Sequence, residues 1–167
     1  MKLPSSRKEV SVLIYEDRPR YDLWLKVILG SILALTLVLG FVLLTVDILG
    51  AWIMFGTTLF DALLFRAILP RRFQIFEDRV KILLGGPFAL NIPLVDISEV
   101  RSASGREVFI YWGIRFATSP SGVIEIVRRK GLSVVISPLN PDLFIEQANR
   151  ALESARDRSQ SSSYLSS

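Results

Sequence analysis

The stretch "LFRAILPRRFQIFEDRVKIL", residues 64–83, decides the fold because its pattern changes at Pro70. The part before Pro70 ends a long apolar run. In the part after Pro70, apolar residues such as Phe73 and Ile75 alternate with polar residues such as Gln74. Alternation with a period of two is typical of a β-strand that has one buried face. The stretch therefore predicts a membrane helix that leads directly into a β-sheet domain.

Two apolar runs, residues 27–46 and 48–69, lie before this change, and Asp47 is the only charged residue between Val27 and Phe60. About 20 helical residues are enough to cross a hydrocarbon core of about 30 Å. The first run is too long for a signal peptide, and no cleavage pattern of small residues follows it. The rest of the chain is too small to enclose two such helices. The sequence therefore predicts an antiparallel transmembrane hairpin.

Basic residues flank the hairpin at its outer ends, whereas its short connection carries only Asp47. The positive-inside rule then places both chain ends in the cytoplasm of a multi-pass inner (plasma) membrane protein. Residues 1–26 are expected to form a cytoplasmic N-terminal segment. The flanking basic residues are Arg7, Lys8, Arg18, Arg20 and Lys26 before the hairpin, and Arg66, Arg71 and Arg72 at its end.

A cytoplasmic domain of six or seven short antiparallel strands and one helix is predicted over residues 71–154. A serine-rich tail, residues 155–167, is expected to be disordered because of its polar composition. Residues 9–15 alternate weakly and are apolar outside the membrane, which suggests an extra strand on this sheet or on a neighbour's. The domain's predicted elements are a hairpin at 71–86 with Glu77 and Asp78 at its tip, a turn or bulge at Gly85 and Gly86, strands within 88–100 and 108–118, and a hairpin at 122–138. They end with a helix at 140–155, whose apolar stripe consists of Phe144, Ile145, Ala148 and Leu152.

Three pieces of the domain, residues 73–82, 92–100 and 134–145, follow one another in an order and spacing that resemble the bacterial pleckstrin-homology-like family. The version that is similar has two transmembrane helices before the domain. The resemblance implies an α+β membrane protein, in which the hairpin precedes an antiparallel barrel or sandwich capped by a C-terminal helix. It implies no particular ligand.

Asp61 is the unusual residue of the second apolar run, because a carboxylate inside a membrane is costly and usually faces protein. One interpretation satisfies it locally, by Thr57 and Thr58 one turn earlier or by Thr36 across the hairpin. A second brings it against a polar group of another membrane subunit. A third, a proton relay, is disfavoured because two helices form no pathway.

Two basic groups are candidates for contact with anionic lipid: Arg66, Arg71 and Arg72 at the end of the hairpin, and Arg128, Arg129 and Lys130 in the second β-hairpin. Basic residues near a membrane surface attract anionic headgroups. The alternative for the second group is a solvated hairpin tip. A specific phosphate site is not expected, because Glu77 and Asp78 at the first tip would repel an anion.

The chain has no histidine and no cysteine, and its net charge is +4. It therefore lacks the commonest general base near neutral pH and a thiol nucleophile. We expect no enzyme, cofactor, metal or nucleic-acid partner. The prediction is an accessory or scaffold subunit that binds membrane lipids and integral-membrane proteins. The alternatives are a peripheral sensor of anionic lipid and a self-assembling oligomer.

Overall fold

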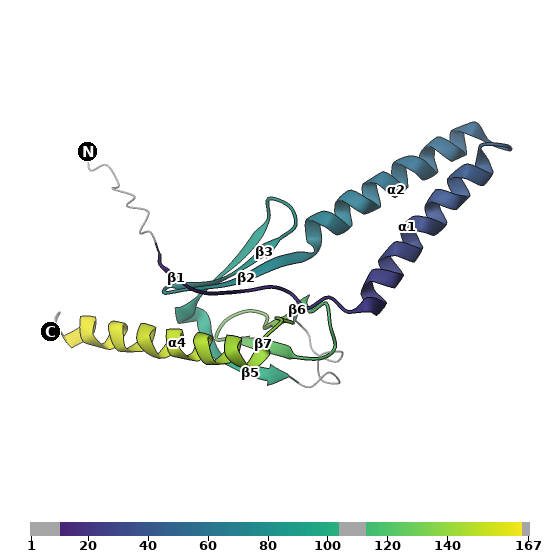
Figure 1. The fold of residues 1–167 in the computed structure, drawn as a ribbon. Helices are drawn as coiled ribbons and strands as arrows, with labels where there is room; N and C mark the ends of the chain where they lie inside the picture. Colours follow the sequence, from purple (N-terminus) through teal and green to yellow (C-terminus); the bar gives the residue numbers. More distant parts are fainter. Residues whose placement is uncertain (1–10, 104–112, 165–167) are drawn as a thin grey trace, which may run out of the picture.

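A computed structural model describes residues 11–103 and 113–164, and Figure 1 shows two long helices projecting from a domain of two sheets and a C-terminal helix. The helices are α1 (Leu23–Leu43) and α2 (Ile48–Ile68), each of 21 residues. Both are long and apolar enough to cross a membrane. Helix α1 begins four residues before the predicted start at Val27 and ends before Val46, because the chain already turns over residues 44–46.

The two helices lie side by side and are antiparallel. Asp47 begins α2 as its N-cap, and its carboxylate accepts a hydrogen bond from the Leu49 amide at 3.1 Å. Gly40 lies so close to Phe55 that a Cβ there would be 2.7 Å from the ring. The predicted hairpin of apolar helices is therefore present, with glycine allowing close packing between them.

The first sheet has the order β1-β2-β3-β4 and is antiparallel throughout. The hairpin predicted after Pro70 is confirmed, and Glu77 and Asp78 lie between β2 and β3. The strands are β1 (Leu13–Asp17), β2 (Pro70–Phe76), β3 (Arg79–Leu84) and β4 (Ala89–Pro93).

Strand β1 confirms the hypothesis of an extra N-terminal strand, with a shift in its position. The prediction covered residues 9–15, of which 9 and 10 lie outside the described residues, and the strand observed is Leu13–Asp17. Because β1 pairs with β2, residues 13–17 belong to the sheet domain. The cytoplasmic location expected for residues 1–26 stays a prediction.

The second sheet has the order β5-β7-β8-β6 and follows a short 3₁₀ turn, η1 (Leu94–Asp96). Strand β6 pairs with β8 in parallel, whereas an entirely antiparallel domain was expected. The reason is that β8 inserts between β6 and β7, so β6 lies beside a strand that runs in its own direction. Residues 108–112 of the predicted strand lie outside the described residues. The strands are β5 (Ile97–Ala103), β6 (Ile114–Phe116), β7 (Val123–Arg128) and β8 (Val134–Ile136).

The core lies between the two sheets and the C-terminal helix α4 (Pro141–Tyr164). Of the predicted apolar stripe of α4, Phe144, Ala148 and Leu152 are buried, and Ile145 is partly buried against the same core. The side chains predicted to face inward from the first hairpin are also fully buried. The sheet residues with no exposed surface are Phe73, Ile75, Val80, Ile82, Ile92, Ile124, Ile126, Val134 and Ile136.

Helix α4 continues through Tyr164, so the prediction of disorder from residue 155 is wrong up to that point. Residues 165–167 lie outside the described residues. Two arginines of the extension are bonded to the sheets. Arg156 donates to the Ser98 carbonyl oxygen at 2.8 Å, and Arg158 donates to the Glu77 carbonyl oxygen at 2.9 Å. These contacts stabilise the end of α4, whose polar composition alone does not favour a helix.

Candidate functional site

The residues singled out from the sequence in the two apolar helices make hydrogen bonds that do not involve Asp61. The hydroxyls of Thr36 and Thr58 lie 2.9 Å apart across the hairpin. Thr57 donates to the Ile53 carbonyl oxygen one turn earlier, at 2.9 Å. None of the three threonines bonds to Asp61, because helical hydroxyls are satisfied by carbonyl oxygens of their own helix. These bonds give Asp61 no partner among the three threonines, and both its local satisfaction and its contact with another subunit stay predictions.

The two basic groups lie at opposite ends of the domain. Arg66, Arg71 and Arg72 lie where α2 passes into β2. The amide of Arg129 donates to the Asp96 carbonyl oxygen at 2.7 Å, beyond the far end of β4. The seven residues of β2 separate these ends by about 20 Å. Arg128, Arg129 and Lys130 therefore cannot join the first group in one site.

The three arginines at the end of α2 differ in whether they form an ion pair. Arg72 forms an ion pair with Glu16 of β1, with 3.0 Å between Nη1 and Oε1. Among the described residues, Arg66 and Arg71 form no ion pair. Arg71 lies at a β-bulge, since the register shifts between Pro70 and Arg72. A bulge re-aims a side chain. Arg66 and Arg71 are thus the cations available at the helix–sheet junction.

Residues 17–22, which we call the entrance segment, connect β1 to α1 and are bonded to the second sheet. The amide of Arg20 donates to the Ser137 carbonyl oxygen at 2.8 Å. The amide of Leu139 donates to the Arg18 carbonyl oxygen at 2.8 Å, and Pro19 bridges to Pro138. The chain that enters α1 therefore crosses from the first sheet to the second before the helix begins.

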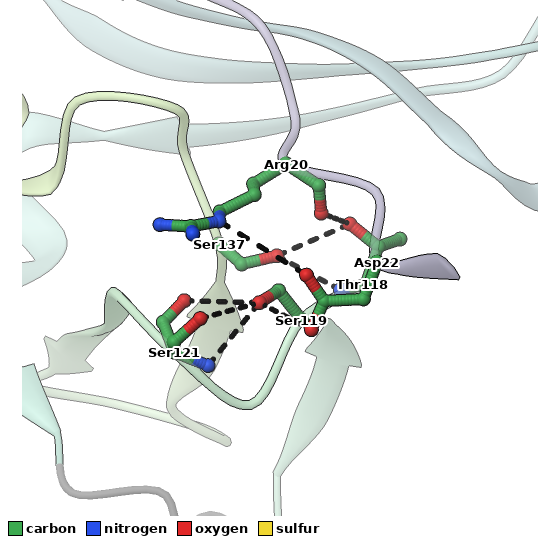
Figure 2. Close-up of polar contacts among 6 residues, drawn as sticks. All are labelled: Arg20, Asp22, Thr118, Ser119, Ser121 and Ser137. Carbon is green, nitrogen blue, oxygen red and sulfur yellow. Dashed lines mark hydrogen bonds and ion pairs between the residues drawn. The ribbon is translucent and has the colours of Figure 1, made fainter. Parts of the chain in front are cut away.

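Side chains reinforce this crossing in the polar cluster of Arg20, Asp22, Thr118, Ser119, Ser121 and Ser137 (Figure 2). Ser137 is completely buried, and its Oγ accepts from the Thr118 amide at 2.8 Å. The Thr118 hydroxyl donates to the Arg20 carbonyl oxygen. The Ser119 hydroxyl donates to the Asp22 carboxylate at 2.8 Å. Since Asp22 immediately precedes α1, the cluster fixes the start of that helix on the second sheet.

The hydroxyls of the polar cluster are arranged for positioning. Thr118 and Ser119 are each 3 % exposed, and each hydroxyl is engaged with the entrance segment. A serine nucleophile needs a base that removes its proton. Asp22 accepts the proton of Ser119 in a hydrogen bond, and the chain contains no histidine to complete a relay. The arrangement therefore favours a structural role.

The exit from α2 is held by the backbone of the turn between β3 and β4. The amides of Gly85 and Gly86 donate to the carbonyl oxygens of Leu69 and Ala67, at 2.9 and 3.2 Å. A Cβ on Gly85 would overlap the Arg66 carbonyl oxygen, so only glycine fits there. The sequence had suggested only a turn or bulge for these two glycines. Their close approach to α2 is a contact that sequence reasoning missed.

Tyr21 joins the entrance to the exit, because its hydroxyl donates to the Pro70 carbonyl oxygen. Burial raises the pKa of Tyr21 above 10.0, and the nearby positive charge of Arg71 partly opposes that shift. The phenol therefore stays protonated, and remains a donor, throughout the physiological pH range.

Asp17 anchors the entrance segment at its other end. Its carboxylate is 6 % exposed and accepts from the amides of Arg18 and Asn140, at 2.7 and 2.9 Å. Asn140 directly precedes α4, so one carboxylate positions both the entrance segment and the C-terminal helix. Burial, followed by the negative charge of Asp17, raises the pKa of Tyr15 above 10.0, although an Asn140 hydrogen bond lowers it.

No family model matches the chain, and no match was found among curated proteins or solved structures. The likeness of residues 73–82, 92–100 and 134–145 to the pleckstrin-homology-like family stays a prediction.

Proposed function

We propose that this protein is a non-enzymatic, membrane-anchored interaction module with a pleckstrin-homology-like domain. It acts as an accessory or scaffold subunit that holds other proteins at the cytoplasmic face of the membrane. The observation that carries the proposal is that the apolar hairpin is bonded to the sheets at both of its ends. The domain is therefore held in one orientation relative to the hairpin.

A fixed orientation is more than membrane attachment needs. A short flexible linker would be enough to tether a domain to a helix. Here the entrance segment is bonded to the second sheet through Ser137 and Leu139, and α2 continues directly into β2 of the first sheet. Such a junction is useful when the direction in which the domain faces matters, as it does for a subunit that positions a partner.

The basic charge around the hairpin supports the cytoplasmic orientation of the domain. In this orientation the tip between β2 and β3, together with Arg128, Arg129 and Lys130, faces away from the membrane. Among the described strands, β4 and β5 each lie at an edge of their sheet, where a partner could add a strand. Addition of a strand to an open edge is a common mode of peptide recognition. The separation of the two basic groups weighs against the rival function of a lipid sensor that uses both.

The native mass in mild detergent, taken from the original host at natural abundance, tests this proposal. We expect a stoichiometric assembly in which integral-membrane proteins co-migrate with the chain and survive added salt. The matched variant Thr118→Val/Ser137→Ala, which removes the polar cluster's main contacts, should lower the recovery of that assembly. A mass equal to one chain with its detergent would contradict a subunit role, and a multiple of one chain would indicate self-assembly instead.

A further inference from the structure

We propose that the turn between β3 and β4, residues 85–88, is a third membrane contact, in which Phe88 enters the phospholipid headgroup layer beside α2. This inference rests on the proposed function, because it takes α1 and α2 as membrane-spanning. It adds to that function a surface of the sheet domain that lies against the bilayer.

The position of the turn is set by its bonds to the last turn of α2. Gly85 and Gly86 donate to the carbonyl oxygens of Leu69 and Ala67, and the Leu84 amide closes the turn by donating to Phe88 at 3.1 Å. Figure 1 shows the connection between β3 and β4 beside the base of α2. Because one helical turn rises about 5.4 Å, the turn lies within a few ångströms of the end of the apolar helix.

That height corresponds to the interfacial layer of a bilayer. The 21 residues of α2 span about 31 Å, which matches a hydrocarbon core of about 30 Å. The headgroup regions add about 5 to 7 Å on each side. A turn bonded to Ala67, one residue before the helix ends at Ile68, therefore lies at the level of the headgroups.

The chemistry of the turn suits that layer. Residues 83–89 carry no charge, and Pro87, Phe88 and Ala89 are exposed. The Phe88 side chain is 62 % exposed, so the domain itself does not bury it. Arg71 reaches the same place, with its Nε 3.3 Å from where a Gly85 Cβ would lie. An exposed aromatic beside a cation is the arrangement by which interfacial segments meet phospholipid.

The absence of cysteine from the chain allows a test with single labels on the full-length protein. Phe88→Cys, Val95→Cys and Leu35→Cys each receive an environment-sensitive NBD label, in vesicles of phosphatidylcholine and phosphatidylglycerol. Val95 is the matched control, because it is 68 % exposed and lies just beyond the other end of β4. Leu35 lies near the middle of α1, is 61 % exposed and reports whether the hairpin is in the membrane.

We expect the label at position 88 to emit at shorter wavelength than the label at 95. We also expect it to be quenched by nitroxide-bearing lipid and to be several-fold less accessible to aqueous acrylamide. If the label at 35 lies in lipid while that at 88 is as accessible to acrylamide as that at 95, the membrane contact of the turn is refuted and the hairpin anchor stands. If the label at 35 is itself in water, the anchor fails, and the inference fails with it.

Discussion

The two ends of the apolar hairpin are joined to the domain by different means. At the entrance, the chain arrives from β1 and is bonded to the second sheet by buried side chains, among them Ser137 and Thr118. At the exit, α2 continues into β2, and the backbone of Gly85 and Gly86 bonds to its last turn. The entrance thus adds buried side-chain hydroxyls to its backbone bonds, whereas the exit relies on a backbone approach that leaves no room for a Cβ at Gly85.

This difference determines what mutation can do at each end. A side-chain hydrogen bond contributes about 1 kcal/mol, and a buried partner left unsatisfied costs about 1–3 kcal/mol. A Cβ forced against backbone requires the backbone itself to move, which costs more. We therefore expect substitution of the exit glycine, Gly85, to destabilise the protein more than any substitution at the entrance. Substitution of the exit side chains should destabilise it less than substitution of the entrance side chains.

The largest effect is expected for Gly85→Ala. The added Cβ would overlap the Arg66 carbonyl oxygen, so the turn between β3 and β4 must separate from α2. We expect a loss of about 3 kcal/mol in the free energy of unfolding. Thermal unfolding in detergent measures it, with Gly30→Ala as control because a Cβ on Gly30 meets no atom within 4 Å. A Gly85→Ala protein as stable as its control would show that the exit is not held by this approach.

The next effect concerns the entrance. Ser137→Ala removes the acceptor of the buried Thr118 amide, and we expect a loss of about 1–3 kcal/mol in the free energy of unfolding. Ser154→Ala is the control, since its hydroxyl bonds at an exposed position to the Arg150 carbonyl oxygen of its own helix.

The same variant should also loosen the hairpin. Spin labels at Leu35→Cys and Val95→Cys report the distance from α1 to the far end of the domain. We expect a narrow distance distribution in the parent protein and a broader one after Ser137→Ala. Equal widths in the two proteins would rule out the entrance segment as a positioning contact.

The sequence predicted the elements well because their signals are local. The alternation from Phe73 to Ile82 identified both strands of the first hairpin and their buried faces, and Phe144, Ala148 and Leu152 identified the buried side of the C-terminal helix. Two apolar runs with basic flanks identified the paired helices. Each of these signals lies within one element, so neighbouring residues are enough to read it.

The contacts of the entrance segment could not be predicted, because they join residues that are far apart in the chain. Thr118 and Arg20 are 98 residues apart, and Asn140 and Asp17 are 123 residues apart. Serine, threonine and aspartate are common in loops, so their types give no sign of such a pairing. The extension of α4 was missed for the same reason, since Arg158 is held by Glu77 of a distant hairpin.

A smaller effect is expected for Tyr21→Phe, which removes the bond from the entrance to the Pro70 carbonyl oxygen. We expect a loss of about 1 kcal/mol in the free energy of unfolding at neutral pH. The folded pKa of Tyr21 lies above its ordinary value of 10.0, so folding favours the protonated phenol. That stability is complete below pH 10 and is lost as the pH rises through the folded pKa.

The parent protein should therefore lose stability more steeply than Tyr21→Phe above pH 10. Chemical unfolding of both proteins at a series of pH values from 7 upward measures the difference. Parallel curves over the whole range would mean that the phenol titrates alike in the folded and unfolded chains. Tyr15→Phe should show the same direction, because its pKa is also raised by burial and by Asp17.

The smallest effect is expected for Arg72→Gln at the exit. Arg72 pairs with Glu16 at 3.0 Å, but its side chain is 59 % exposed, and exposed ion pairs contribute only about 0.2–1 kcal/mol. Glutamine keeps a hydrogen-bond donor for Glu16, so we expect the free energy of unfolding to change by only about 0.2 kcal/mol, the lower limit of this range. Urea unfolding at low and high salt checks this, since a screened pair should weaken with salt in the parent protein alone. A loss as large as that of Ser137→Ala would mean that side chains hold the exit as they hold the entrance, and the contrast between the two ends would no longer stand.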